Sequence, residues 1–228
     1  MLVQVRVKNF LSICDEQVFS LVAANGLKEK NSHLNENAVA VDEQLSLVKA
    51  AVVYGANASG KSNLLKAIAF LATALTEAPP DGLAVEDYQP FVLSQSTADA
   101  PTLLEVVFLV DGTHYRYGFE VQRQLVVAEW FYVWRKQETV VFHRTSSELR
   151  IGRTYPKLRE LQNKGMINSA ALLANLGALF NDESCLLLKG WAQKVSYFDP
   201  VREMNNLLLS LLQAGHSKET VGDLRGPE

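Results

Sequence analysis

One eight-residue segment constrains the fold of this chain more than any other feature of its sequence. Residues 55–62 read Gly-Ala-Asn-Ala-Ser-Gly-Lys-Ser and match the pattern G-x-x-x-x-G-K-[ST] at every fixed position. Gly55 and Gly60 allow backbone angles that other residues disfavour, so successive N–H groups can point toward phosphate oxygens. The segment therefore predicts a phosphate-binding loop between a strand and a helix.

The sequence on both sides of this loop matches that context. The apolar run Leu45–Tyr54 predicts a short strand that is buried on both faces. Beyond Lys61, apolar residues recur at the spacing of an amphipathic helix, at Leu64, Ile68, Leu71 and Leu75. The sequence Ala-Pro-Pro-Asp-Gly at 78–82 predicts the end of that helix. The alternative, an incidental glycine turn, does not account for this context.

The chemistry of the motif gives specific side chains a role. We expect Lys61 to reach the β- and γ-phosphates of a nucleotide, and the Ser62 hydroxyl to be a ligand of Mg²⁺. The helix that begins near Lys61 adds the positive end of its dipole at the same point. The nucleotide-binding residues expected here are Gly55, Ala56, Asn57, Ala58, Ser59, Gly60, Lys61, Ser62 and Asn63.

Elsewhere, alternating apolar and polar residues predict strands, and longer periods predict helices. Asp111-Gly112 suits a two-residue hairpin turn, so the region around it predicts an antiparallel meander. The stretch Ala23–Gln44 is interpreted as a long loop. Strands are expected at Leu2–Val7, Glu16–Val22, Thr102–Val110, Thr113–Val121, Leu125–Arg135 and Val140–Arg144. Helices are expected at Ser169–Phe180, at Glu183–Val195 and from Asp199-Pro200 to about Gly215.

Composition is that of an ordinary globular protein. With 228 residues, 48% hydrophobic and 21% charged, the chain is not a disordered tail, and its net charge of −3 shows no overall basic excess. Cys14 and Cys185 lack the spacing of a disulfide framework or a zinc site. No stretch approaches the ~20 apolar residues that cross a bilayer. We therefore expect a cytoplasmic protein with no membrane partner.

Charge is uneven along the chain, and the unevenness has two interpretations. Residues 116–164 contain ten Lys and Arg against five Asp and Glu. Such a segment can face the phosphates of DNA or RNA, or it can be a solvated strand face, which we favour. Trp130, Tyr132 and Trp134 alternate onto one strand face. They can stack on nucleic-acid bases or, as we favour, pack in a core or subunit interface.

The sequence also resembles a known family. An N-terminal strand, VRVKNFLSI, followed about fifty residues later by YGANASGKSN, is similar to the RecF/SMC/OLD-like branch of ABC-type P-loop ATPases. Within that branch it most resembles bacterial abortive-infection ATPases of the AbiLii, RloA and PtuA kind. Their antiparallel lobe is similar to the segments PFVLS, HYRYGFEV and EWFYVWR. The resemblance is close over about Met1–Arg144 and loose beyond it.

This resemblance implies a fold and a set of partners. It implies an α/β P-loop fold with a mixed sheet around the phosphate loop, an antiparallel β lobe and a C-terminal helical segment. An ATP-binding core is expected at 1–154 and a helical segment with a polar tail at 155–228. Two heads of such ATPases clamp ATP and Mg²⁺ between them. The implied partners are a second copy of the chain and a nuclease or other effector, with DNA or RNA left open.

Two more nucleotide contacts are implied by the resemblance. A glutamine that links the nucleotide to the helical lobe is best matched by Gln89, while the alternatives are Gln95, Gln122 and Gln124. The early Asn-Phe turn lies near the nucleotide in related heads, which implies contacts from Lys8 and Asn9. The alternative is that Asn9 is a turn residue next to a core Phe10.

The chain departs from the family in the residues that support hydrolysis. It has no LSxG signature, the nearest strings being at 93–96 and 209–211. Two segments resemble the acidic Walker B strand, one ending at Asp111 and one at Asp199. A hairpin turn explains Asp111 better, and a helix N-cap explains Asp199 better. We therefore expect the N-terminal part of an ATPase head, truncated before its catalytic second half.

Two functions stay open on these observations. The first is an ATP- and Mg²⁺-binding module of an ABC-type ATPase in phage defence or DNA maintenance, which controls a partner by nucleotide-dependent dimerisation. The second is a regulatory fragment that binds nucleotide, does not hydrolyse it and acts through interaction alone. A GTPase is disfavoured because the sequence Asn-Lys-Gly-Met at 163–166 lacks the aspartate that reads guanine.

Overall fold

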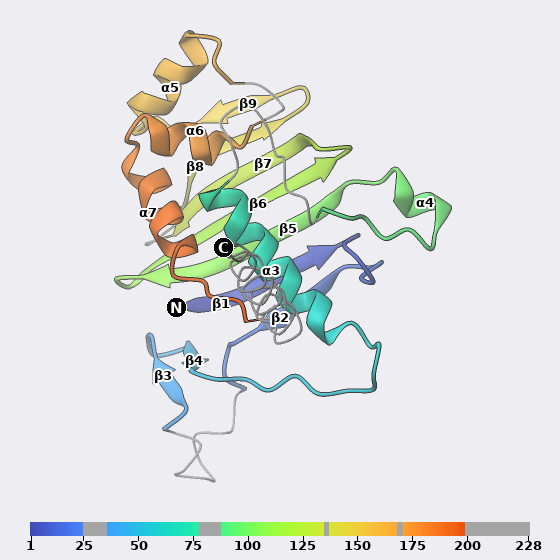
Figure 1. Ribbon diagram of the computed structural model, residues 1–228. Coiled ribbons are helices and arrows are strands. Elements are labelled where there is room, and N and C mark those ends of the chain that lie inside the picture. The colour runs from blue at the N-terminus through green and yellow to red at the C-terminus, as the bar shows by residue number, and fades with distance from the viewer. Residues whose placement is uncertain (25–35, 78–87, 135–136, 168–170, 199–228) are drawn as a thin grey trace, which may run out of the picture. The chain divides into compact units, whose positions relative to one another are not determined.

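The computed structural model describes residues 1–24, 36–77, 88–134, 137–167 and 171–198. Within the unit Met1–Val195, helices pack on one face of a large sheet (Figure 1). A second unit, Ser196–Glu228, is described only as far as Phe198. The helix predicted from Asp199 and the N-cap predicted at Asp199 therefore lie outside the described residues.

The large sheet has seven strands, and every pairing in it is antiparallel. Asp111 and Gly112 have positive φ angles of 47° and 73°, as a two-residue hairpin requires, so the predicted meander and its turn are confirmed. The strand order is β2-β1-β5-β6-β7-β8-β9. The strands are β1 (Leu2–Lys8), β2 (Gln17–Ser20), β5 (Thr102–Val110), β6 (Thr113–Gln122), β7 (Leu125–Trp134), β8 (Glu138–Thr145) and β9 (Leu149–Ile151).

The strand predicted directly before the glycine-rich loop is largely wrong. Within Leu45–Tyr54 only β4 (Ser46–Val48) forms. It pairs in a separate two-stranded sheet with β3 (Ala38–Ala40), which lies in the stretch predicted to be a loop. Beyond β4, Val52 and Tyr54 are 86% and 90% exposed. Apolar residues favour burial, but a buried strand also needs a neighbour, and no described strand pairs with this run. The mixed sheet expected around the loop is likewise absent from the described residues.

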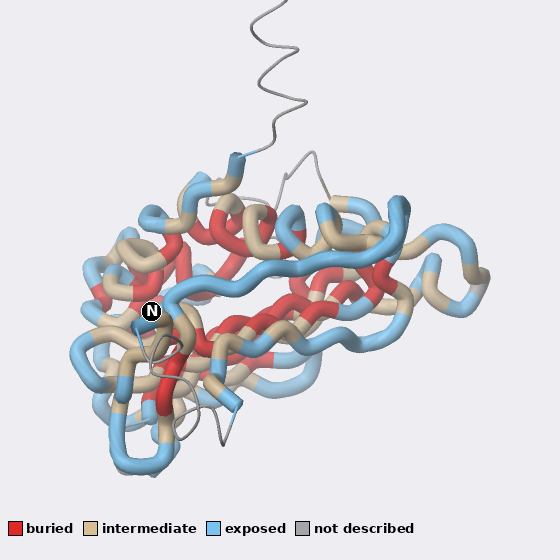
Figure 2. The backbone as a smooth tube through the Cα atoms, turned by 90° about the horizontal axis from the view of Figure 1, so that it is seen from below, coloured by how far each residue is buried: buried red, intermediate tan, exposed pale blue. Residues whose placement is uncertain are grey.

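Helices on one face of the sheet close the hydrophobic core. In the view of Figure 2 the buried residues lie between the sheet and the helices. The helix predicted from Lys61 is confirmed and ends at Thr76. Of the helices predicted at Ser169–Phe180 and Glu183–Val195, the described residues form shorter ones at Leu173–Leu179 and Glu183–Ala192. Among the described residues, no helix is long and apolar enough to cross a bilayer. The helices are α3 (Lys61–Thr76), α4 (Gln95–Ala98), α5 (Pro156–Asn163), α6 (Leu173–Leu179) and α7 (Glu183–Ala192).

The C-terminal helices share the core of the sheet. Leu158 of α5 and Leu188 of α7 are fully buried in the same cluster as Phe108 and Phe131 of the strands. Trp191 of α7 stacks on Phe108, with ring centroids 4.6 Å apart. The compact unit Met1–Val195 therefore includes these helices together with the sheet.

A buried carboxylate joins the sheet to the start of α6. Glu129 of β7 is fully buried and accepts hydrogen bonds from the backbone N–H groups of Leu173 (2.7 Å) and Ala174 (3.0 Å). It also accepts from the Tyr117 hydroxyl at 3.0 Å and pairs with Arg144 at 2.7 Å. Burial and the neighbouring carboxylate raise the pKa of Tyr117 well above its ordinary value. Glu129 thus caps α6 from a strand that is distant in sequence.

The sheet face opposite the helices carries the alternating aromatic residues. Trp130 is only 9% exposed, lies against Gly118 and donates its indole N–H to Glu105 at 2.7 Å. Tyr132 hydrogen-bonds to His143 at 2.7 Å, whereas Trp134 is 50% exposed. The packing interpretation is thus confirmed for Trp130, whose ring lies against the sheet's own residues.

Candidate functional site

The glycine-rich loop adopts the backbone conformation that its sequence favours. Gly60 has a φ of 89° and is the N-cap of α3, while Ala58 has a φ of 61°. The Gly60 carbonyl accepts hydrogen bonds from the N–H groups of Asn63 (3.0 Å) and Leu64 (3.1 Å), which starts the helix. Residues 51–59 are all exposed. The loop that precedes α3 is thus open to solvent, as an anion site requires.

Lys61 folds back over this loop. Its ammonium donates hydrogen bonds to the carbonyl oxygens of Gly55 (2.9 Å) and Ala56 (2.6 Å) and to the Ser59 hydroxyl (3.3 Å). The ammonium is thus already bonded to the loop. It can exchange these neutral acceptors for phosphate oxygens, with which it forms stronger charge-assisted hydrogen bonds. Ser62, in the first turn of α3, is exposed.

The local geometry requires a glycine at position 60 and leaves little room for a side chain at position 55. A Cβ added at Gly55 would lie 3.1 Å from the Ser59 hydroxyl oxygen, and one at Gly60 would lie 3.2 Å from that of Ser12. At Gly60 the positive φ adds backbone strain for any other residue. The loop, its lysine and the hydroxyl that follows it therefore fit a nucleotide polyphosphate with a hard divalent cation.

The N-terminal turn lies beside this loop, as the resemblance implied. The backbone N–H and C=O groups of Phe10 and Ile13 bond to each other at 2.9 and 2.8 Å, and Asn9 and Leu11 have positive φ. The turn presents Ser12, whose hydroxyl accepts a hydrogen bond from the Asn63 amide at 2.7 Å. Ser12 was not among the residues predicted from sequence, although its neighbours in the Asn-Phe turn were.

Asn9 has a structural role in this geometry. It is fully buried, and its amide nitrogen donates to the carbonyl groups of Thr97 (2.8 Å) and Ala100 (2.7 Å). Its amide oxygen accepts from the Phe91 N–H at 2.9 Å. These bonds occupy the side chain, so the turn-residue interpretation fits better than the nucleotide contact. Lys8, at the end of β1, is exposed.

The structure distinguishes three of the four candidate glutamines. Gln89 is exposed, and its carbonyl oxygen accepts a hydrogen bond from the N–H of Leu11 in the N-terminal turn at 2.9 Å. Gln122 and Gln124 lie at the turn between β6 and β7, where Gln122 donates to the Asp99 carbonyl. The side chain of Gln95 lies outside what the structure describes. Gln89 therefore stays the best candidate for a residue near the loop.

No second catalytic group joins the loop among the described residues. Asp111 is exposed in the β5–β6 hairpin turn, as predicted, and not at the end of a parallel strand. Nor does any cluster of three or more His, Cys, Asp or Glu in the described ranges have the geometry to hold a metal ion. The described part of the chain thus contains a candidate phosphate-binding loop, and no carboxylate beside it is identified as a base for hydrolysis.

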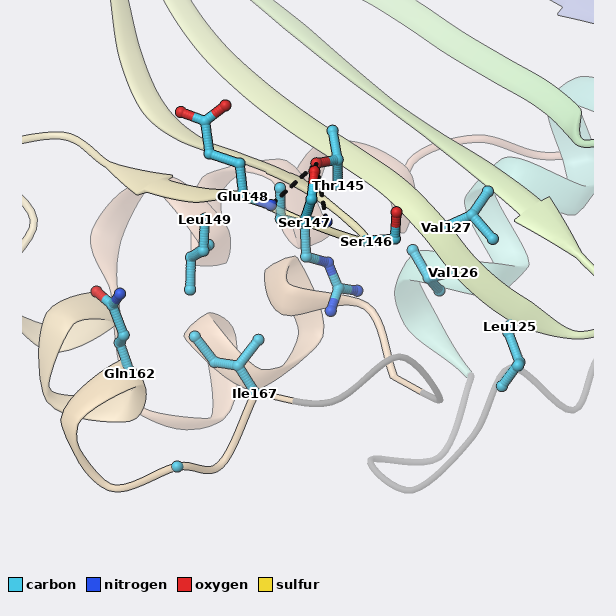
Figure 3. A pocket seen from close by; sticks show the side chains of 12 residues that line it. Leu125, Val126, Val127, Thr145, Ser146, Ser147, Glu148, Leu149, Gln162 and Ile167 are labelled. Carbon is cyan, nitrogen blue, oxygen red and sulfur yellow. Dashed lines mark hydrogen bonds between the residues drawn. The ribbon is translucent and has the colours of Figure 1, made fainter.

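A cavity lies away from the glycine-rich loop, beside α5 and the β8–β9 turn (Figure 3). It measures about 630 Å³ and includes no residue of the glycine-rich loop. Thr145 accepts hydrogen bonds from the N–H groups of Ser147 (3.3 Å) and Glu148 (3.1 Å), which closes the turn at its rim. These polar groups are therefore used in forming the turn.

The basic segment 116–164 is partly neutralised by ion pairs. Arg116 pairs with Glu138, Arg123 with Asp99, Arg144 with Glu129 and Lys164 with Glu160. Within the described residues of this segment, four cations therefore have a carboxylate partner. This pattern favours the solvated-face interpretation over a continuous phosphate-binding surface.

The glycine-rich loop, its folded-back lysine and the helix that follows define a P-loop nucleotide-binding domain of the ATPase class. A family model described as "AAA domain, putative AbiEii toxin, Type IV TA system" matches residues 50–175. The match spans more than half of the chain and includes the whole loop, so the chain belongs to this family of AAA-type P-loop ATPases. Comparison with curated proteins gives no significant match.

Proposed function

We propose that this chain binds ATP together with Mg²⁺ at residues 55–63. The strongest support is the bonding of the Lys61 ammonium to the Gly55 and Ala56 carbonyl oxygens, because it keeps a cation against the loop that the motif assigns to phosphate binding. In this proposal the backbone N–H groups of the loop and the N-terminus of α3 hold the phosphates, and the Ser62 hydroxyl is a ligand of the cation. Bound Mg²⁺ would neutralise phosphate charge.

We further propose that the chain is the ATP-binding module of a bacterial phage-defence or DNA-maintenance system. Two observations support this finer proposal: the AbiEii-type toxin named in the family description, and the resemblance of the N-terminal half to ABC-type ATPases of the RecF/SMC/OLD-like branch. In this account two nucleotide-bound copies associate and thereby control an effector such as a nuclease. The surface of the loop supports association, because residues 51–59 are exposed.

A second candidate function is a regulatory module that binds ATP without hydrolysing it. The observation that favours it is the position of Asp111, which closes a hairpin turn and leaves no described carboxylate as a Walker B residue. Hydrolysis needs an oriented water and stabilisation of the charge that develops on the γ-phosphoryl group. We therefore expect this chain alone to turn over ATP far more slowly than the ~1–100 s⁻¹ of competent phosphoryl-transfer enzymes.

Titration with a fluorescent ATP analogue and Mg²⁺ tests the binding site. Lys61→Ala removes the cation over the loop and should weaken binding at least about tenfold, since charge-assisted hydrogen bonds contribute ~1.5–3 kcal/mol each. Lys66→Ala is the matched control, because Lys66 is an exposed lysine on the same helix. It should bind like the unsubstituted protein. If Lys61→Ala and Lys66→Ala bind the ATP analogue with equal affinity, Lys61 does not contribute to the binding site.

Light scattering coupled to size exclusion tests the association. With ATP and Mg²⁺ the protein should shift from monomer to dimer, and Lys61→Ala should stay monomeric. Phosphate release from the same samples separates the two candidate functions. Turnover near one per second that is lost in Lys61→Ala would favour the hydrolysing module, and its near absence would favour the regulatory module. A dimer that forms equally without nucleotide would contradict control by nucleotide.

A further inference from the structure

We propose that Ser12 is a positioning residue for the nucleotide site, acting through Asn63. The proposal rests on the proposed function, since it concerns the same loop. Ser12 lies on the N-terminal turn, far from the motif in sequence. Its hydroxyl nevertheless accepts a hydrogen bond from the side-chain amide of Asn63 at 2.7 Å. Its hydroxyl oxygen also lies 3.2 Å from where a Cβ on Gly60 would be. Ser12 is thus bonded to Asn63 and lies close to Gly60, at the two ends of the turn that begins α3.

The turn that carries Ser12 is held in place from several sides. The paired backbone bonds between Phe10 and Ile13 close it, and the Leu11 N–H donates to the Gln89 carbonyl oxygen. The buried Asn9 side chain bonds to the backbone of the segment 91–100. The Thr102 hydroxyl donates to the Asn9 carbonyl oxygen. Ser12 is therefore presented by a turn fixed to the sheet, and not by a free loop.

A fixed hydroxyl at this place affects phosphate binding through the helix start. Asn63 donates its backbone N–H to the Gly60 carbonyl, and that bond is the first of the helix. The N–H groups of this first turn are the ones that an anion would use. Holding the Asn63 side chain limits the conformations of the turn before a ligand arrives, which reduces the entropy lost on binding.

The size of the effect follows from the single hydrogen bond. A typical net contribution of one intramolecular hydrogen bond corresponds to roughly a three- to tenfold change in an equilibrium constant. Ser12→Ala should therefore weaken ATP–Mg²⁺ binding about three- to tenfold. The same hydrogen bond is present without nucleotide, and Ser12 is exposed and buries no apolar group, so its loss should lower the melting temperature of the unliganded protein by only about 2–4 °C.

The test is a double-mutant cycle of Ser12→Ala and Asn63→Ala, read by titration with the fluorescent ATP analogue. If Ser12 acts through Asn63, the double variant should bind no more weakly than Asn63→Ala alone. Ser147→Ala, an exposed serine in the β8–β9 turn, is the control and should bind normally. A second readout needs no nucleotide: amide hydrogen exchange of Asn63 and Leu64 should be faster in Ser12→Ala.

The outcomes separate this inference from the proposed function. If the unsubstituted protein binds ATP, Lys61→Ala does not, and Ser12→Ala binds like the unsubstituted protein, the inference fails and the proposed function stands. Additive effects in the cycle, or a lower melting temperature with unchanged exchange at Asn63 and Leu64, also overturn it, because they indicate a general structural role. If the unsubstituted protein does not bind ATP, both fail.

Discussion

Replacement of Glu129 by alanine should destabilise the protein more than any comparable change at an exposed ion pair. The variant removes a fully buried carboxylate that accepts three hydrogen bonds and forms an ion pair with Arg144. It leaves the Arg144 guanidinium, whose side chain is 7% exposed, without its carboxylate partner. It also leaves two N–H groups at the start of α6 and the Tyr117 hydroxyl without this acceptor.

The expected cost follows from burial. Breaking a buried ion pair by removing one partner costs about 3–5 kcal/mol. At roughly 2–4 °C per kcal/mol for a chain of this size, the melting temperature should fall by about 6–20 °C. Glu129→Gln keeps one oxygen acceptor for Tyr117 and Ala174, so it should lose less stability than Glu129→Ala. Urea unfolding followed by tryptophan fluorescence and circular dichroism measures both variants.

The chain contains a matched control for this prediction. Glu138 pairs with Arg116 through two hydrogen bonds of 2.9 and 3.0 Å, but the two side chains are 33% and 36% exposed. Glu138→Ala should therefore cost less than about 1 kcal/mol. If Glu129→Ala and Glu138→Ala lose the same free energy of unfolding, burial is not what makes the Glu129 interaction strong, and the reasoning is refuted.

Three further predictions concern local packing. Asn9→Ala should make the segment 88–101 more sensitive to limited proteolysis, because it removes the amide that fixes this segment to the N-terminal turn; an unchanged cleavage rate would contradict that role. Gly118→Ala should lower the melting temperature by several degrees, since its Cβ would lie 2.6 Å from the Trp130 ring, and no change would refute this contact. Near pH 8 a thiol reagent should modify Cys14 in the folded protein but Cys185 only on unfolding, because Cys185 is 1% exposed and burial raises its pKa well above the ordinary value. Equal rates for the two thiols would contradict this.

The parts of the fold that sequence predicted well are those with local causes. Strands β5 to β8 follow from the alternation of apolar residues, and the turn at Asp111-Gly112 follows from the positive φ that these residues tolerate. Helix α3 follows from apolar residues spaced three and four apart, several of which are buried. The conformation at Gly60 follows from its lack of a side chain. None of these requires knowledge of a distant partner.

The parts that sequence did not predict depend on distant partners. Val52 and Tyr54 have the composition of a buried strand, but composition does not tell whether a neighbouring strand exists. Glu129 is one carboxylate in an apolar strand, and its role depends on the backbone of α6, more than forty residues away. Asn9 bonds to residues about ninety positions away. An asparagine between Lys8 and a core phenylalanine was the available signal for this role, and the turn-residue alternative used it.

A crystal structure with Mg²⁺ and a non-hydrolysable ATP analogue tests the central claim most directly. The account predicts that the phosphates lie within hydrogen-bonding distance of the backbone N–H groups of the loop and of Lys61. The Lys61 ammonium should have exchanged the Gly55 and Ala56 carbonyl oxygens for phosphate oxygens, with the Ser62 hydroxyl on the cation. A nucleotide bound elsewhere, or a Lys61 still bonded to both carbonyl groups beside bound phosphates, would contradict the account.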